Sequence, residues 1–93
     1  MKNTVIYKYD LRNTDKQVVM LPVGAKILTI QSQYEEPKLW AFVNPDAEIE
    51  QRHIEIFGTG HELIYDAGAE RNYISTYQLS GEYYVFHAFE RIT

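Results

Sequence analysis

Residues 4–11 read TVIYKYDL, and polar and apolar side chains alternate along this stretch. The apolar side chains share one parity, which contains Val5, Tyr7, Tyr9 and Leu11. The opposite parity is polar apart from Ile6. A period of two residues is typical of a β-strand with one buried face. The fold class therefore depends on how often this pattern recurs.

The pattern recurs along most of the chain. Further strands are predicted at residues 16–21, 25–34, 38–44, 49–57, 72–79 and 82–90. About seven short strands separated by turn residues predict an all-β fold, either a small antiparallel sandwich or a partly open barrel. No repeat and no break in composition divides the sequence, so residues 1–93 are expected to form a single domain.

Turn residues predict how some of these strands are connected. The two-residue link Ser80-Gly81 predicts a β-hairpin between the last two strands. The polar residues 12–15, RNTD, predict another hairpin across residues 4–21. Residues 35–37, EEP, are expected to form the turn that follows the third strand.

The composition narrows the classes of function. None of the 93 residues is Cys, so disulfides and thiolate metal sites are excluded, which suits a reducing cytoplasm. The net charge is −4, and residues 35–70 hold nine Asp or Glu against two Lys or Arg. Binding to a phosphate backbone needs clustered Lys and Arg, so a nucleic-acid partner is not expected. Membrane association is not expected either, because no apolar run approaches the roughly 20 residues of a membrane helix.

The stretch IFGTGHEL contains the loop Gly58-Thr59-Gly60-His61, which has more than one interpretation. A phosphate-binding loop needs a Lys and the N-terminus of a helix after the glycines, whereas Glu62 follows here. A nucleotide site is therefore disfavoured, and a turn at the end of a strand is favoured. Recognition of a ligand or a partner by this loop is left open.

No pattern of residues indicates a catalytic, metal or cofactor site. The three histidines, His53, His61 and His87, do not have the spacing of zinc ligands. No serine has the Gly-x-Ser-x-Gly setting of a nucleophile. The clustered carboxylates Glu48, Glu50 and Glu55 could imitate a glycosidase pair, but Glu48 and Glu50 share parity on one strand beside a turn, as exposed acidic residues ordinarily do.

Two of the predicted strands, residues 38–44 and 82–90, are apolar on both faces. A strand of this kind is covered on both sides, and an uncovered one promotes aggregation. A lone domain of 93 residues has little core to spare, so a homo-oligomer is expected. Its interface is predicted at Trp40, Phe42, Tyr84 and Phe86.

Four motifs are spread over most of the chain, from about Val5 to Glu90: Leu21-Pro22-Val23-Gly24-Ala25, Leu39-Trp40-Ala41, Gly58-Thr59-Gly60-His61 and Val85-Phe86-His87-Ala88-Phe89-Glu90. With the strands between them, they make the sequence resemble a family of small bacteriophage and prophage proteins of unknown function. The resemblance implies a phage accessory protein made in the cytoplasm of the bacterial host. It implies no activity.

The leading hypothesis is a non-enzymatic phage accessory protein that acts in the host cytoplasm. It would engage a host protein or sequester a small ligand, with the loop from Gly58 to His61 at the site. A structural or assembly component of the virion is the alternative hypothesis. A small hydrolase that uses His61 with Glu62 or His87 is the third.

Overall fold

The computed structural model describes residues 3–62, 68–81 and 83–92. Its seven elements are all β-strands: β1 (Val5–Asp10), β2 (Lys16–Pro22), β3 (Lys26–Gln33), β4 (Glu36–Val43), β5 (Ile49–Gly58), β6 (Arg71–Leu79) and β7 (Tyr84–Arg91). The predicted all-β fold of about seven strands is confirmed. Within the described part of the chain, no helix is long and apolar enough to cross a membrane.

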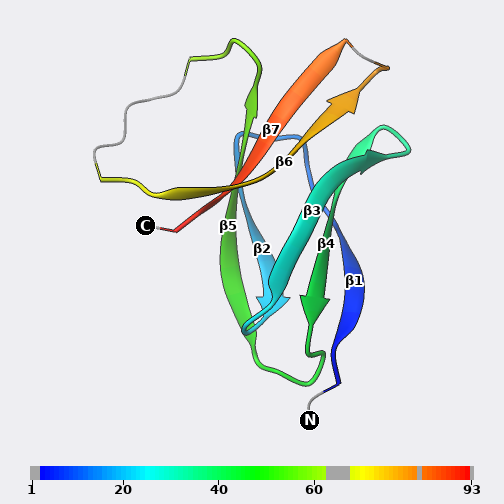
Figure 1. Cartoon of the computed structure of the whole chain (residues 1–93), viewed down its shortest axis with the longest axis vertical. Helices are drawn as coiled ribbons and strands as arrows, with labels where there is room; N and C mark the ends of the chain where they lie inside the picture. Colours follow the sequence, from blue (N-terminus) through cyan, green and yellow to red (C-terminus); the bar gives the residue numbers. More distant parts are fainter. Residues whose placement is uncertain (1–2, 63–67, 82, 93) are drawn as a thin grey trace.

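The strands form two antiparallel sheets that make an open sandwich (Figure 1). One sheet has the order β1-β4-β3, and the other has the order β2-β5-β7-β6. The molecule measures 44 × 35 × 16 Å, and the short dimension fits two layers, because stacked sheets lie about 10 Å apart. The sequence predicted a sandwich or a partly open barrel; the two sheets have the sandwich arrangement and do not close into a barrel.

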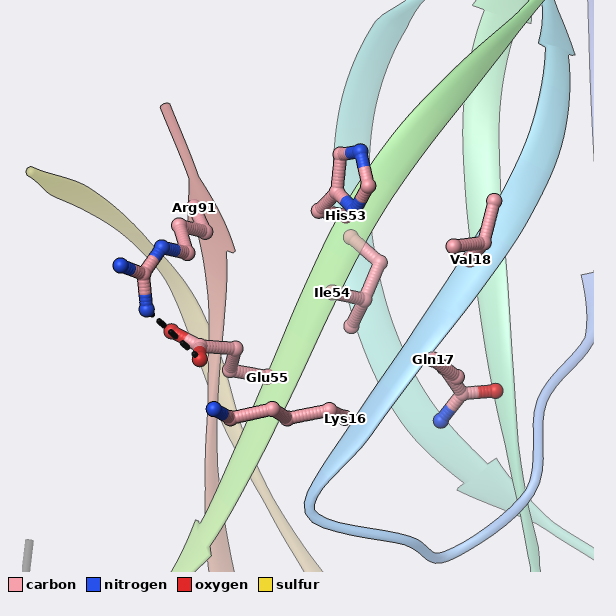
Figure 2. A pocket seen from close by; sticks show the side chains of 7 residues that line it. All are labelled: Lys16, Gln17, Val18, His53, Ile54, Glu55 and Arg91. Carbon is pink, nitrogen blue, oxygen red and sulfur yellow. Dashed lines mark ion pairs between the residues drawn. The ribbon is translucent and has the colours of Figure 1, made fainter. Parts of the chain in front are cut away.

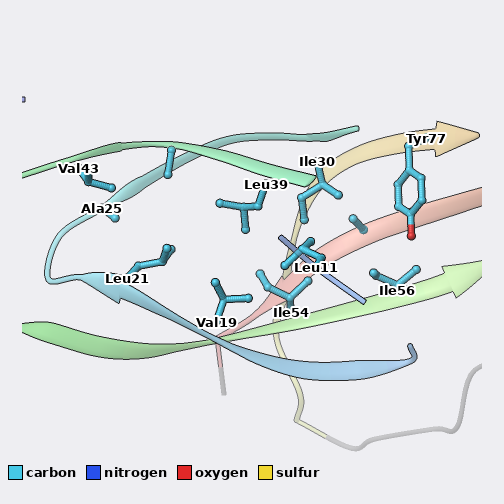
Figure 3. Packing of buried hydrophobic residues seen from close by; sticks show 12 residues of the cluster. Leu11, Val19, Leu21, Ala25, Ile30, Leu39, Val43, Ile54, Ile56 and Tyr77 are labelled. Carbon is cyan, nitrogen blue, oxygen red and sulfur yellow. The ribbon is translucent and has the colours of Figure 1, made fainter. Parts of the chain in front are cut away.

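The hydrophobic core lies between the two sheets, where the inward side chains of both meet (Figure 3). In β4 the inward residues are Leu39, Ala41 and Val43, which are completely buried or nearly so. The other core residues are Leu11, Val19, Leu21, Ala25, Ile30, Ile54, Ile56, Tyr77 and Ala88. Burial of one Leu or Ile side chain stabilises the fold by about 1.5–3 kcal/mol. In β4, which is apolar on both faces, Trp40 and Phe42 are left on the outer face.

The hairpin predicted across residues 4–21 is wrong, because β1 pairs with β4 and β2 pairs with β5. The link between β1 and β2 carries the chain from one sheet to the other. The side chain of Gln17 holds this corner: its Oε1 accepts the Arg12 N–H at 3.0 Å and its Nε2 donates to the Arg12 carbonyl at 2.6 Å. Near this corner, Leu11 on one side and Val19 and Leu21 of β2 on the other enter the core.

The two remaining turn predictions fare differently. β6 and β7 do form an antiparallel hairpin, from Leu79 opposite Tyr84, although its connection is longer than two residues. Between β3 and β4 the turn residues are Tyr34 and Glu35, both with positive φ (54° and 63°), and β4 already begins at Glu36. A tight hairpin turn with two positive φ values normally contains Asn or Gly. Neither residue type is present at this turn, which explains why the turn was predicted too late in the sequence.

The two sheets approach each other most closely where β3 faces β6. Both strands carry a register shift there, between Ile27 and Thr29 in β3 and between Tyr73 and Ser75 in β6. The Ser75 hydroxyl accepts the backbone N–H of Ile30 at 2.9 Å and donates to the Ile30 carbonyl at 2.6 Å. One side chain therefore satisfies two backbone groups that a neighbouring strand would otherwise bind.

Candidate functional site

The loop from Gly58 to His61 is a turn that ends β5. The His61 N–H donates to the Gly58 carbonyl at 3.1 Å, which closes the turn. Gly60 has a φ of +83°, a conformation that only glycine adopts without strain. The turn favoured from the sequence is therefore present, and Gly60 is required for the backbone conformation.

Gly58 has a second role, because the imidazole of His61 lies against it. A methyl group added at Gly58 would come within 2.6 Å of His61 Cε1 and 2.7 Å of Nδ1. A side chain at this position would therefore displace the ring. The first glycine of the loop lets the histidine fold back over the end of β5.

Thr59 attaches the loop to the neighbouring strand β7. Its N–H donates to the Val85 carbonyl at 3.1 Å, and its Oγ1 is hydrogen-bonded to His87 Nε2 at 2.7 Å. The other ring nitrogen of His87 is hydrogen-bonded to Thr76 Oγ1 at 3.1 Å, and Thr76 is bonded to the Tyr73 hydroxyl at 2.6 Å. This chain of side chains crosses from the loop to β6, so it holds the loop in one position.

A pocket of about 500 Å³ lies between this loop and the start of β7. Its lining residues are Gly58, Thr59, His61, Tyr83, Tyr84, Val85 and Phe86. Among the described lining residues, His61 is the only titratable group apart from the tyrosine hydroxyls, so this part of the wall is mainly aromatic and uncharged. A pocket of this size with a few polar groups suits a small ligand or one side chain of a partner.

A second group of polar side chains lies on the outer face of the four-stranded sheet. Glu55 is only 2% exposed, and it forms ion pairs with Arg71 and, at 3.5 Å, with Nη1 of Arg91. Figure 2 shows Arg91 and Lys16 beside its carboxylate, at a shallow pocket of about 440 Å³. The guanidinium of Arg71 also lies 5.6 Å from the centre of the Phe57 ring, a cation–π distance.

The burial of Glu55 was missed from the sequence, where it was grouped with Glu48 and Glu50 as a cluster of carboxylates. Glu48 and Glu50 are near a turn, whereas Glu55 sits mid-strand between the buried Ile54 and Ile56. The two arginines that pair with it are 16 and 36 positions further along the chain, at 71 and 91. The feature of the sequence that could have indicated this burial is a carboxylate with an apolar residue on each side.

The four residues predicted as an oligomer interface fall into two groups on different sheets. Trp40 and Phe42 are on the outer face of β4, and Phe42 is exposed. Tyr84 is exposed at the start of β7, while Phe86 packs against the core and stacks on Tyr77, with ring centres 5.5 Å apart. The loop predicted as a binding site and the Tyr84–Phe86 half of the predicted interface therefore meet at one pocket.

The residues considered for catalysis do not form a catalytic arrangement. Among the described residues, the side chain of His61 has no hydrogen bond or ion pair with Glu62 or His87, and both ring nitrogens of His87 are bonded to threonines. No group of three or more His, Asp or Glu in residues 3–62, 68–81 and 83–92 could hold a metal ion. In the part of the chain that the structure describes, His61 is therefore not paired with either of the groups considered as its partner in proton transfer.

Fold and pocket together define a class: a small, cysteine-free β-sandwich with an aromatic pocket at one end. Comparison with protein families then places the chain. Residues 2–93 match the model of a domain of unknown function, DUF7352, so the chain belongs to this family. No curated protein and no solved structure matches it significantly.

Proposed function

We propose that this chain is a non-enzymatic binding protein whose binding site is the pocket between the Gly58–His61 loop and residues Tyr83, Tyr84 and Phe86. The observation that carries the proposal is the convergence of a braced turn and three aromatic side chains on one cavity of about 500 Å³. Aromatic side chains supply large contact areas at a low cost in conformational entropy.

The lining indicates the chemistry of the bound group. The walls are aromatic and carry no Lys, Arg, Asp or Glu among the described residues, so a charged group would lose its hydration without gaining a partner. A flat or apolar group fits better, stacked on the rings with a polar atom at a tyrosine hydroxyl or at His61. The occupant is either a small ligand or an apolar side chain of a host protein.

The proposed setting is the cytoplasm of a bacterial host, where the chain acts as a phage accessory protein. The support for this setting is the resemblance carried by the Leu21–Ala25, Leu39–Ala41, Gly58–His61 and Val85–Glu90 motifs. A chain without cysteine is consistent with a reducing compartment.

The test compares two tyrosines of equal exposure. Tyr83, 88% exposed, lines the pocket, and Tyr34, 89% exposed, lies in the β3–β4 turn. Wild-type protein, Tyr83→Ala and Tyr34→Ala are incubated with bacterial lysate, and captured proteins and small molecules are identified by native mass spectrometry. A species that wild type and Tyr34→Ala retain and Tyr83→Ala loses supports the pocket as the site.

A species retained equally by all three proteins would place binding elsewhere on the molecule. A second variant, His61→Ala, then removes the ring on the opposite side of the pocket. If both Tyr83→Ala and His61→Ala bind as wild type does, the proposal is wrong.

A further inference from the structure

The sandwich has four edge strands, and three of them carry a feature that blocks pairing with another strand. β3 and β6 are bent by register shifts and bridged through Ser75. β2 ends in Pro22, which has no N–H to donate. β1 pairs with β4 in unbroken register from Val5 to Asp10 and has neither a bulge nor a proline. Edge strands without such features pair readily with further strands.

Charged side chains protect many edges, but the two charges of β1 are turned back over its own sheet. The Lys8 ammonium reaches across β4 and donates to Gln33 Oε1 of β3 at 2.8 Å. Asp10 accepts a hydrogen bond from Lys38 of β4 at 2.9 Å, and this contact lowers the pKa of Asp10. Both groups are therefore engaged within the sheet, and neither projects from the free edge.

The remaining side chains of β1 are apolar and exposed on both faces. Ile6 is exposed on the outer face, beside the exposed Phe42 of β4. Val5 and Tyr7 point to the inner face and are also exposed, because β1 lies at the border of the molecule, at the right in Figure 1. A partner that covers both faces must lie in the plane of the sheet, as an added strand does.

We propose that β1 pairs antiparallel with β1 of a second copy of this chain, which joins two three-stranded sheets into one of six strands. The choice of a second copy rests on self-complementarity: an antiparallel strand pair has the two-fold symmetry of a homodimer, and each copy offers the same apolar side chains. With Lys8 and Asp10 engaged elsewhere, no like charges are opposed. The proposal is independent of what the pocket near His61 binds.

The contact extends beyond the two strands. Six-residue strands give a pairing about 20 Å long. Side chains on both faces add to the contact, with Ile6 and Phe42 on the outer face and Val5 and Tyr7 on the inner face. Stable interfaces need roughly 1,000 Å² of total buried area, so these flanking side chains are required for the dimer. This assembly would use the Phe42 part of the predicted oligomer interface and not Tyr84.

The test uses two isoleucines of equal exposure. Ile6 is 54% exposed on β1, and Ile49 is 55% exposed on β5 of the other sheet. Light scattering after size exclusion is measured from about 1 to 500 µM for wild type, Ile6→Lys and Ile49→Lys. We expect wild type and Ile49→Lys to reach twice the chain mass of 10.9 kDa and Ile6→Lys to need at least ~10-fold higher concentration.

A second measurement tests whether the β1 strands of two copies lie next to each other. Because the chain has no cysteine, single Tyr7→Cys and Ile49→Cys variants each carry one thiol. Mild oxidation is expected to cross-link Tyr7→Cys into a dimer at least ~10-fold faster than Ile49→Cys, since self-paired β1 strands bring the two thiols together. Wild type that stays monomeric at 500 µM, or a dimer that Ile6→Lys leaves intact, would overturn the proposal.

Discussion

The two sides of this sandwich differ in whether their edge strands are covered by another part of the chain. On one side, β3 and β6 face each other across the gap between the sheets, and Ser75 satisfies both backbone groups of the buried Ile30. On the other side, β1 ends the three-stranded sheet with apolar side chains exposed on both faces. The closed side is covered within the chain, whereas the open side leaves apolar side chains exposed.

The difference comes from single residues and not from the strand pattern. β1 and β3 are both short alternating strands that pair with β4. The register shift in β3 and the serine opposite it turn one edge toward the second sheet. β1 lacks both features and keeps an unbroken register with β4. The closed side is therefore expected to determine the stability of the monomer, and the open side its assembly.

The largest expected effect is the difference in stability between an isoleucine substitution on the closed side and one on the open side. Ile30→Ala on the closed side leaves a cavity in the core and should lower the free energy of unfolding by about 2–5 kcal/mol. Ile6→Ala on the open side removes exposed side-chain atoms and should cost less than about 1 kcal/mol in the monomer. Urea unfolding at micromolar concentration measures both. Equal losses would mean that β1 is covered within the monomer and that the comparison fails.

The next effect tests the bridge between the sheets. Ser75→Ala leaves the N–H and the carbonyl of Ile30 without partners, and an unsatisfied buried group costs about 1–3 kcal/mol. Ser32→Ala is the matched control, because Ser32 is an exposed serine of β3 itself. Thermal unfolding should therefore show a lower midpoint for Ser75→Ala alone. A similar midpoint for the two variants would mean that water can replace the Ser75 hydroxyl.

A pH titration examines the closed side through Tyr77 of β6. Its hydroxyl donates to Asn13 Oδ1 at 2.6 Å, and burial raises the pKa of Tyr77 to about 12 from 10.0. Between these values the unfolded chain loses the proton and the folded chain keeps it. The resulting stability is complete below pH 10 and is lost as the pH rises toward 12, by up to about 2 kcal/mol.

Tyr77→Phe isolates this contribution from the other groups that titrate in alkali. Urea unfolding of wild type and Tyr77→Phe at pH 8, 10 and 11.5 should show a steeper loss for the wild type. Parallel curves for the two proteins would mean that the Tyr77 hydroxyl is as well solvated in the folded state as in the unfolded state.

The smallest effect on stability is expected at the pocket, which belongs to neither side. Gly58→Ala would place a methyl group against the His61 ring, which can rotate away. The free energy of unfolding should change by less than about 1 kcal/mol, because Ala replaces Gly in a strand without positive φ. The NMR signals of His61 should shift strongly while those of His53 stay unchanged. Unshifted His61 signals would mean that the ring does not lie on Gly58.

Alternation of side chains was enough to predict the strands and the all-β class. It did not predict which face of β4 is buried, because both faces are apolar, and only the structure shows that Leu39, Ala41 and Val43 lie in the core. The glycines of the loop predicted a turn, which Gly60 forms with positive φ. The strands and this turn depend on neighbouring residues, so the local sequence contains the information.

Strand pairing and the polar clusters were not predictable in the same way. Two consecutive strands joined by four polar residues have the pattern of a hairpin, yet β1 and β2 belong to different sheets. The ion pairs of Glu55 with Arg71 and Arg91 join residues that are close only after β5, β6 and β7 have assembled. Long-range contacts of this kind are decided by the packing of the whole core.

The β3–β4 turn has a consequence for the pocket, although it lines no part of it. Glu35 keeps a left-handed backbone that costs roughly 1 kcal/mol, and its Oε2 accepts the N–H of Ser80, itself left-handed, at 2.6 Å. Ser80 lies three residues before Tyr83, so the two hairpin tips are fastened to each other. Glycine at position 35 would relax the backbone and remove this fastening. The relief of backbone strain and the loss of this hydrogen bond would have opposite effects on thermal stability, while Tyr83 would gain freedom of motion on the nanosecond scale.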